Sequence, residues 1–222
     1  MNTFHSLAAS CLRAIGLFHP LRDRRRDWRF RRISRAKIRS WRAQGSPLPA
    51  PDLVKYNVIR EYARRYRTTV LIETGTFYGN AIFTVRRDFR EIHSIELAPA
   101  LHELNVRELG HLSHIHLHLG DSAKVLPLLL RDVREPALFW LDGHFCAGPS
   151  ARAKTYDTPI SAELDHLLRQ PAGQNVVLID DARLFVGRDN YPTIPELCEI
   201  VHRQRPDATF AVDLDIIRIA PV

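Results

Sequence analysis

The stretch Val70-Leu-Ile-Glu-Thr-Gly-Thr-Phe-Tyr-Gly79 runs from a short apolar segment into a turn with two glycines. An apolar run of this length, followed from Gly79 by a helical pattern, predicts a buried strand and the helix after it. Two glycines at such a turn let the backbone approach a ligand closely. By itself the turn is just as compatible with an ordinary tight connection between strand and helix.

The same alternation of strand and helix continues along the chain. Strands are predicted at 70–73, 92–96, 115–119, 137–141 and 176–179, and helices at 52–66, 79–88, 99–109, 122–131 and 158–168. Short apolar strands between amphipathic helices indicate a parallel sheet covered on both faces. The last two strands, 209–212 and 216–219, are only three residues apart, which predicts a hairpin. We expect an α/β fold with a doubly wound Rossmann-like seven-stranded sheet and a C-terminal antiparallel hairpin.

Two helix starts carry recognisable capping signals. Thr158 precedes Pro159, as an N-cap residue before a proline at the first helical position would. Thr193-Ile-Pro-Glu196 fits a capping box that opens the last helix.

The net charge of +7 is distributed unevenly along the chain. Residues 1–42 hold twelve Lys or Arg and two Asp or Glu, a net charge of +10, and the remainder carries −3. We therefore expect a basic amphipathic arm at 1–44, a proline-rich linker at 45–51 and an α/β domain at 52–222. A mildly acidic body argues against nucleic-acid binding.

Aromatic and aliphatic residues alternate with arginines in the arm, which suits a segment lying on an anionic membrane surface. A solvated basic helix, a helix packed on the domain and a disordered tail are the alternatives. No stretch approaches the ~20 apolar residues of a membrane span. Three cysteines without a CxxC pair favour a reducing compartment. We expect a cytoplasmic protein, peripheral at the inner face of a membrane if the arm binds there.

Carboxylates stand at the ends of the second and third strands. Glu96 lies 23 residues beyond Glu73, where a carboxylate can accept hydrogen bonds from a ribose diol. Asp121 follows the third strand and could accept from an adenine amine or serve only as an N-cap. Because the carboxyl ends of parallel strands line the ligand crevice, the combination predicts a nucleoside site.

Residues 52–222 resemble the class I S-adenosylmethionine-dependent methyltransferases. The resemblance rests on the motifs Glu73–Gly79, Ser94–Leu97, Gly120–Ser122, Trp140–His144 and Leu178–Asp181, and on the closing hairpin. It implies that the Gly75 turn holds the methionine part of the cofactor, Glu96 the ribose and Asp121 the adenine. The cofactor-binding residues would be Glu73, Thr74, Gly75, Thr76, Gly79, Glu96, Leu97, Asp121 and Ser122.

Three aspartates follow the fourth and fifth strands. Asp142, Asp180 and Asp181 would converge on one crevice, and their mutual repulsion calls for protons or a cation. Oxygen ligands of this kind suit Mg²⁺ or Mn²⁺. The set is similar to metal-dependent O-methyltransferases that modify sugar hydroxyls, which implies catalytic roles for Asp142 and, as base, His144, where those enzymes have a carboxylate. The alternative is that these aspartates cap or bond loops without a metal.

The function expected from these residues is S-adenosylmethionine-dependent O-methylation of a sugar, glycan or related small molecule. Arg152, Lys154 and Arg183 could contact an anionic acceptor or be solvated. The competing class is a non-catalytic α/β binding module docked to a membrane or acidic partner by the arm. A nicotinamide oxidoreductase is disfavoured, because the turn lacks the GxGxxG spacing. His111, His114, His116 and His118 read as a histidine-rich face of an edge strand rather than a metal cluster. The sequence leaves the oligomeric state open.

Overall fold

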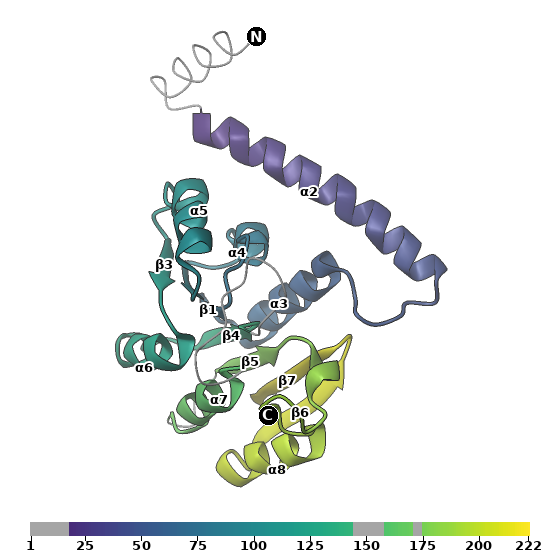
Figure 1. Ribbon diagram of the computed structural model, residues 1–222, viewed down its shortest axis with the longest axis vertical. Helices are drawn as coiled ribbons and strands as arrows, with labels where there is room; N and C mark the ends of the chain where they lie inside the picture. Colours follow the sequence, from purple (N-terminus) through teal and green to yellow (C-terminus); the bar gives the residue numbers. More distant parts are fainter. Residues whose placement is uncertain (1–17, 144–157, 171–174) are drawn as a thin grey trace. The chain divides into compact units, whose positions relative to one another are not determined.

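The computed structural model describes residues 18–143, 158–170 and 175–222, so His144, Arg152 and Lys154 lie outside the described residues. The chain forms two units, Met1–Pro47 and Leu48–Val222. In the described part of the first, the arginine-rich sequence forms a long helix, α2 (Phe18–Ala43) (Figure 1). It ends at the glycine and prolines of the predicted linker.

The second unit alternates helices and strands along the chain. Its elements are α3 (Asp52–Tyr66), β1 (Val70–Thr74), α4 (Asn80–Val85), β2 (Glu91–Glu96), α5 (Pro99–Leu109), β3 (Ile115–Leu119), α6 (Ser122–Asp132), β4 (Ala137–Leu141), α7 (Ile160–Leu168), β5 (Val176–Ile179), the 3₁₀ helix η1 (Ala182–Leu184), α8 (Ile194–Gln204), β6 (Ala208–Asp213) and β7 (Ile216–Pro221).

The strands form one seven-stranded sheet in the order β3-β2-β1-β4-β5-β7-β6. The first five run parallel, and β7 is antiparallel to both β5 and β6. Every residue of β1, β4 and β5 is buried, as expected for central parallel strands covered on both faces. The expected fold class is confirmed, including the C-terminal hairpin.

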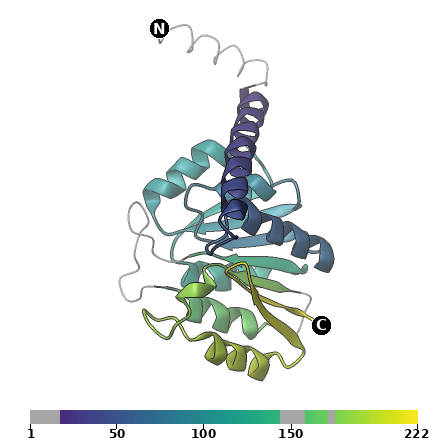
Figure 2. The ribbon, with the colours of Figure 1, turned by 90° about the vertical axis from the view of Figure 1, so that its right-hand side faces the viewer.

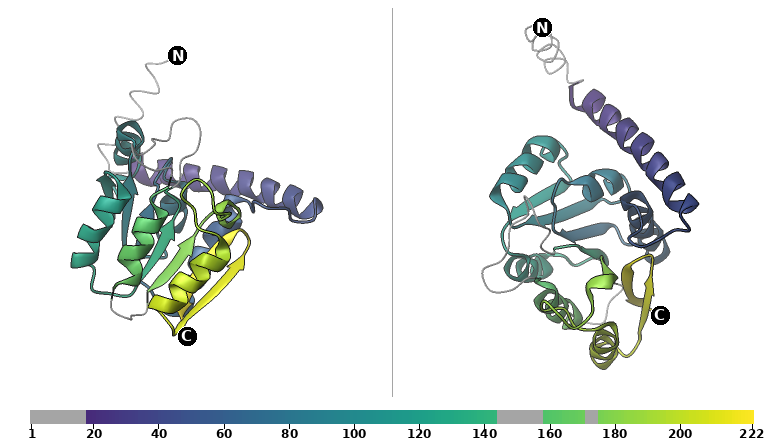
Figure 3. Two further views of the ribbon diagram at one scale, coloured as in Figure 1. Left: turned by 60° about the horizontal axis from the view of Figure 1, so that its bottom comes forward. Right: turned by 45° about the vertical axis from the view of Figure 1, so that its right-hand side comes forward.

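Helices cover both faces of this sheet (Figure 2). The core on one face takes its helical residues from α6, α7 and α8, which lie side by side in the left view of Figure 3. The core on the other face takes them from α3, α4 and α5. Their amphipathic patterns place apolar residues toward the sheet, so two apolar layers fix the strands between them.

Several local predictions can be compared directly with the structure. The capping box at Thr193 is present, with the Glu196 backbone N–H donating to the threonine hydroxyl and the Glu196 carboxylate accepting from the Thr193 N–H. The helix predicted over 79–88 is shorter, because it ends at Val85 in a turn that leads to the buried Phe89. Pro159, not Thr158, is the N-cap of α7, although the Thr158 hydroxyl accepts from Ile160 N–H at 3.3 Å.

The histidine-rich strand β3 lies at the sheet edge, as predicted. The rings of His116 and His118 lie 4.9 and 5.4 Å from that of His93 on β2, centroid to centroid. These histidines therefore contact one another as stacked rings on the edge of the sheet.

Candidate functional site

The predicted site residues follow neighbouring strands at one edge of the sheet. Glu73 is the fourth residue of β1, Glu96 ends β2, Asp142 follows β4 and Asp180 follows β5. In the register, Thr74 pairs with Ile95 and Leu141, and Leu141 pairs with Ile179. The carboxyl ends of β2, β1, β4 and β5 therefore form one continuous rim, which is where ligands bind in open α/β sheets.

Gly75 brings the backbone of the first turn against the end of β4. Its φ is +84°, and a Cβ at this position would lie 2.5 Å from the carbonyl oxygen of Asp142. No side chain fits there without displacing the backbone. Gly75 N–H and Thr76 N–H both donate to Ile95 O, at 2.9 and 3.2 Å. The glycine at position 75 is therefore explained by packing, since the turn lies between β2 and the residue after β4.

Gly79 closes the same turn and has φ +65°. A Cβ there would collide with the side chain of Asn105 on α5. The amide nitrogen of Asn105 donates to Phe77 O at 2.6 Å and to Leu101 O at 2.9 Å, which ties the turn to α5. The glycine at position 79 is therefore required for the packing of this turn against Asn105. Asn105 was not identified from the sequence.

Glu96 organises the turn through both of its carboxylate oxygens. Phe77 N–H donates to one oxygen and Ala98 N–H to the other, each at 2.8 Å. The side chain is buried at 6% exposure, and each oxygen keeps a second lone pair for a ligand hydroxyl. Leu97, also a predicted cofactor contact, is half-buried beside it.

Glu73 is the most strongly perturbed carboxyl of the rim. Its pKa is raised to about 8: burial raises it most, the Ser94 hydroxyl that donates to the carboxyl lowers it, and the charge of Glu96 raises it. Ser94 in turn shares a 2.6 Å hydrogen bond with the Thr76 hydroxyl. Thr74 is fully buried, and its hydroxyl has no hydrogen-bond partner among the residues that the structure describes. A cationic ligand next to Glu73 would favour the ionised carboxylate.

Asp121 is the N-cap of α6. Its carboxylate accepts from Ala123 N–H at 3.1 Å, and Ser122 behind it is buried. The capping alternative for Asp121 is therefore realised. An adenine contact by the same carboxylate stays a prediction, because a capping carboxylate retains further acceptor sites.

Asp180 and Asp181 pair with a cation from the protein itself. The Nζ atom of Lys55 lies 2.5 Å from Asp180 Oδ1 and 2.9 Å from Asp181 Oδ1. Burial alone would lower the pKa of Lys55, but the two carboxylates outweigh it and the pKa is raised above 10.5. Burial and the charge of Asp181 raise the pKa of Asp180, against the opposing effect of Lys55.

The expectation of a three-aspartate metal site does not fit this arrangement. Across residues 18–143, 158–170 and 175–222, no three His, Cys, Asp or Glu side chains are grouped to hold a metal ion. Asp180 and Asp181 face the Lys55 ammonium instead of forming an open set of oxygen ligands with Asp142. Sequence reasoning missed Lys55, although it occupies a core position of α3, one helical face with Val58, Ile59 and Tyr62.

Tyr56, the next residue of α3, is influenced by the charges of the rim carboxylates. Its pKa is raised well above 10 by burial first, and then by the charges of Asp52, Asp142, Glu73 and Asp180. The phenol therefore stays protonated and can donate a hydrogen bond near these carboxylates. It was not identified from the sequence, because a tyrosine on an amphipathic helix reads as core.

A second cation, Arg183, contacts Asp181 at the same carboxylate oxygen as Lys55. Arg183 Nη1 lies 2.6 Å from Asp181 Oδ1 and also pairs with Asp215 Oδ2. The Arg183 N–H donates to Asp215 Oδ1 at 2.9 Å. Arg183 thus links the end of β5 to the β6–β7 turn, and a role in contacting an acceptor is not needed to explain its position.

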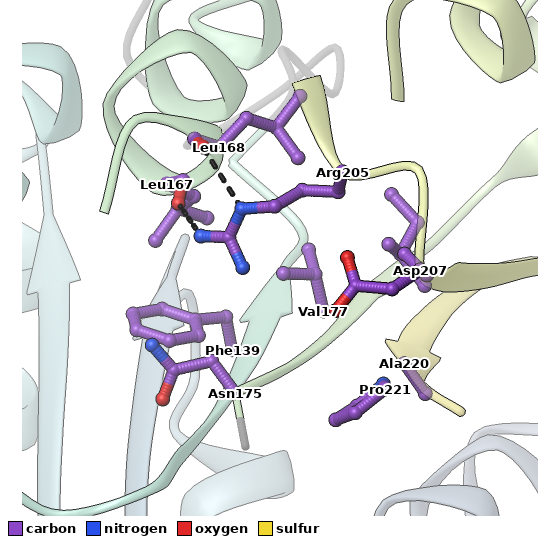
Figure 4. Close-up of a pocket in the computed structure, with 11 residues that line it drawn as sticks. Phe139, Leu167, Leu168, Asn175, Val177, Arg205, Asp207, Ala220 and Pro221 are labelled. Carbon is purple, nitrogen blue, oxygen red and sulfur yellow. Dashed lines mark hydrogen bonds between the residues drawn. The ribbon is translucent and has the colours of Figure 1, made fainter. Parts of the chain in front are cut away.

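A separate hollow lies at the opposite edge of the sheet, around Asn175, Arg205 and Ala208 (Figure 4). Arg205 donates there to the carbonyl oxygens of Leu168, Leu167 and Gln170, at 3.0, 3.1 and 2.6 Å. These bonds satisfy two C-terminal carbonyls of α7 and one just beyond its end. The hollow is therefore distinct from the carboxyl rim and has a structural explanation.

Neither a family model nor a curated protein matches this sequence. Solved structures do share its fold. The O-methyltransferase TomG from Streptomyces achromogenes, involved in tomaymycin synthesis and solved with SAM, is 19% identical, with a TM-score of 0.54 over 83% of this chain and 86% of that one. An O-methyltransferase from Bacillus cereus, solved with SAH, is 14% identical, with a TM-score of 0.54 over 82% and 88%. The SAH-bound methyltransferase PaMTH1 from Podospora anserina is 16% identical, with a TM-score of 0.51 over 76% and 78%. With its strand order and antiparallel β7, this chain has the class I S-adenosylmethionine-dependent methyltransferase fold.

Proposed function

We propose that the protein is an S-adenosylmethionine-dependent methyltransferase that methylates a hydroxyl of a sugar, glycan or related small molecule. The observation that carries this proposal is the single rim that unites the Gly75 turn with Glu73, Glu96 and Asp142. The fold shared with structures that contain SAM or SAH supports the cofactor. The acceptor class rests only on the resemblance to sugar O-methyltransferases.

The residues at the rim fit such a cofactor. The Gly75 turn has a backbone surface that a Cβ would occupy, Glu96 has lone pairs for a ribose diol, and Glu73 is a buried carboxyl that a positive charge would ionise. When bound, S-adenosylmethionine supplies an electrophilic methyl group on a positively charged sulfur. Thr74, Thr76, Gly79, Leu97, Asp121 and Ser122 complete the proposed contact set.

Methylation of a hydroxyl forms a carbon–oxygen bond, breaks the carbon–sulfur bond and releases the hydroxyl proton. The protein must therefore hold the acceptor oxygen in line with the methyl group and accept a proton. We propose that Asp142, which follows β4 beside Gly75, helps to hold the acceptor oxygen. His144, two residues further along, would accept the proton. Histidine is a suitable base near neutral pH.

Calorimetric titration of the full chain with S-adenosylmethionine tests the cofactor assignment. We expect saturable binding with a Kd on the order of micromolar, and loss of binding in Glu96→Ala. Glu103→Ala, a change of the same type on the neighbouring helix α5, serves as the matched control and should bind normally. An absence of binding by the wild-type chain would refute the proposed function.

Transfer of a labelled methyl group from S-adenosylmethionine to a panel of nucleotide sugars and free glycosides tests the acceptor class. Alkali-stable label in the sugar supports O-methylation, whereas label in amine-containing acceptors alone would refute it. Asp142→Ala should lose transfer while retaining cofactor binding. If Asp142→Ala loses methyl transfer but keeps all of the protein's biological function in cells, the non-catalytic binding module becomes the better description.

We also propose that α2 binds an anionic membrane surface. At 100° per residue, Arg24, Arg25, Arg31, Arg32, Arg35, Arg39 and Arg42 fall within roughly a third of its circumference, and all are exposed. Trp28 and Leu21 lie in the same sector, at 60% and 46% exposure, with Arg32 stacked over the Trp28 ring. In the described parts of the chain, no helix has the length and apolarity to cross a bilayer. We expect interfacial binding, through arginines and lipid headgroups.

A further inference from the structure

Asp180 and Asp181 place two acidic side chains in a buried position at the end of β5. Each residue is only 7% exposed. Two adjacent buried carboxylates repel each other and lose hydration, so both stay ionised only if a cation compensates them at short range. The cation could be a side chain of the protein or a metal ion, and which of the two it is decides whether this part of the rim can bind a divalent metal.

Lys55 supplies a positive charge from the first turn of α3. Its side chain is 8% exposed, and its Nζ atom lies within hydrogen-bond distance of one oxygen of each aspartate, 2.5 and 2.9 Å away. Asp180 Oδ1 also accepts from Asp181 N–H at 2.7 Å, which holds the Asp180 carboxylate against the backbone of Asp181. Arg183 contacts the same oxygen of Asp181 and also pairs with a further carboxylate, that of Asp215.

The ammonium occupies the space between one oxygen of each aspartate. Mg²⁺ binds carboxylate oxygens at about 2.0–2.1 Å, so an ion shared through Asp180 Oδ1 and Asp181 Oδ1 would need this same space. Lys55 Nζ already contacts both of these atoms. An ammonium and a divalent ion cannot occupy that space together, and two positive groups at such a distance would repel each other.

We propose that Lys55 is the resident counter-ion of Asp180 and Asp181, and that this rim therefore works without a divalent metal. Lys55 is then a positioning residue, since it acts on the two carboxylates. The inference that methyl transfer at this rim needs no divalent metal rests on the proposed function, whereas the pairing of Lys55 with the two aspartates does not.

The first test measures metal binding to the full chain by the loss of free Mn²⁺ signal in electron paramagnetic resonance. We expect no saturable binding by the wild type up to about 1 mM Mn²⁺. Lys55→Met should gain at least tenfold tighter binding, and Lys55→Met/Asp181→Asn should lose that gain. The proposal is overturned if the wild type binds one Mn²⁺ that Asp181→Asn removes, or if Lys55→Met remains as inert as the wild type.

The second test is a double-mutant cycle followed by thermal unfolding. Loss of one partner of a buried charge pair predicts a fall in Tm of roughly 10 °C for Lys55→Met. In the Asp181→Asn background the same change should cost less than half as much, because less negative charge is left uncompensated. Equal losses in both backgrounds would show that Lys55 stabilises the fold by packing alone, and would overturn the proposal.

Two controls complete the design. Lys124→Met removes a lysine whose side chain is 83% exposed and whose Nζ lies 4.0 Å from Asp121, so Tm and Mn²⁺ binding should not change. Lys55→Arg keeps the charge and should remain unable to bind Mn²⁺. If Lys55→Met does not fold, the wild-type and Asp181→Asn titrations still decide the question. Because neither readout requires the cofactor, a failure of S-adenosylmethionine binding leaves this test intact.

Discussion

Gly75 is the residue at which the close contact between the first turn and Asp142 can be tested by substitution. Gly75→Ala places a methyl group in the space of the Asp142 carbonyl, in addition to the cost of a left-handed φ. We expect a loss of roughly 2–4 kcal/mol in the free energy of unfolding and at least tenfold weaker S-adenosylmethionine binding. Urea titration and calorimetry measure these two quantities.

Gly45 offers the matched control for this substitution. Its φ is +82°, close to that of Gly75, but a Cβ there would meet no atom within 4 Å. Gly45→Ala should therefore cost only about 1 kcal/mol and leave cofactor affinity unchanged. Equal effects of the two substitutions would mean that backbone conformation, and not the contact with Asp142, requires the glycine.

Glu73 predicts a pH dependence of stability. Its pKa of about 8 in the folded chain lies above the ordinary carboxyl value, so folding favours the protonated form. This contribution is complete below about pH 4.5 and is lost as the pH rises toward 8. Glu73→Gln mimics the neutral acid and does not titrate. The free energy of unfolding of the wild type, relative to Glu73→Gln, should therefore fall by roughly 2–4 kcal/mol between pH 5 and pH 9. A pH-independent difference would contradict the assignment.

The same carboxyl predicts proton release when the cofactor binds. The sulfonium and amino group of S-adenosylmethionine would favour ionised Glu73, so binding at pH 7 should release a proton from it. Calorimetry in phosphate and in Tris, whose ionisation enthalpies differ, counts that proton. The wild type should release close to one, Glu73→Gln almost none, and equal values in the two proteins would contradict the proposal.

At the scale of single residues, the sequence predicted what local patterns determine. Glu96 was proposed as a site residue because it ends a predicted strand, Asp121 because it follows one, and Gly75 because it stands at a strand-to-helix turn. Lys55 was missed because its partners lie 125 and 126 residues away, and no local pattern reports such a pairing. The one available signal was a lysine at an apolar position of α3.

Among the elements, α2 offers a test of whether its arginine-rich sector binds an anionic membrane surface. Arg31→Gln/Arg35→Gln removes two charges from the arginine-rich sector, whereas Arg29→Gln/Lys37→Gln removes two from the rest of the helix. Each basic residue near an anionic surface contributes about 1 kcal/mol, so the first pair should weaken binding to phosphatidylserine vesicles by roughly 30-fold. The second pair should change it by less than fivefold.

Trp28 emission and salt dependence provide the readout for α2. Vesicle binding should shift the emission of the exposed indole to shorter wavelength, and added NaCl should weaken the binding. Neutral phosphatidylcholine vesicles serve as the lipid control. Equal losses for the two pairs of substitutions would show that net charge alone matters, and would contradict binding through one face.

Element boundaries differ from prediction where tertiary contacts decide them. The helix after Gly79 ends at Val85, because the chain must turn to bury Phe89 and enter β2. The strands at 115–119, 137–141 and 176–179 match their predicted ranges, since flanking turns limit each apolar run. Local patterns therefore located the elements well, and packing shifted some of the ends of both helices and strands.

At the scale of the whole molecule, alternation of strands and helices predicted the sheet but not its strand order. That β1 lies between β2 and β4, and that β7 inserts between β5 and β6, depends on which apolar faces pack together across the fold. The contacts of Lys55, Arg183 and Asp215 join α3, the end of β5 and the hairpin turn. These contacts exist only once the sheet is assembled, which explains why the charge balance of the rim could not be predicted.

The division into two units predicts that the second one folds and binds the cofactor alone. All residues of the two apolar cores on the sheet faces lie within Leu48–Val222, and every proposed cofactor contact lies there too. A chain of residues 48–222 should therefore unfold cooperatively and bind S-adenosylmethionine within about threefold of the full-length affinity, which is under 1 kcal/mol. The same truncation should lose binding to phosphatidylserine vesicles. Loss of cofactor affinity in a truncated chain that still unfolds cooperatively would assign α2 a part in the site, whereas retained vesicle binding would place the lipid-binding surface on the α/β unit.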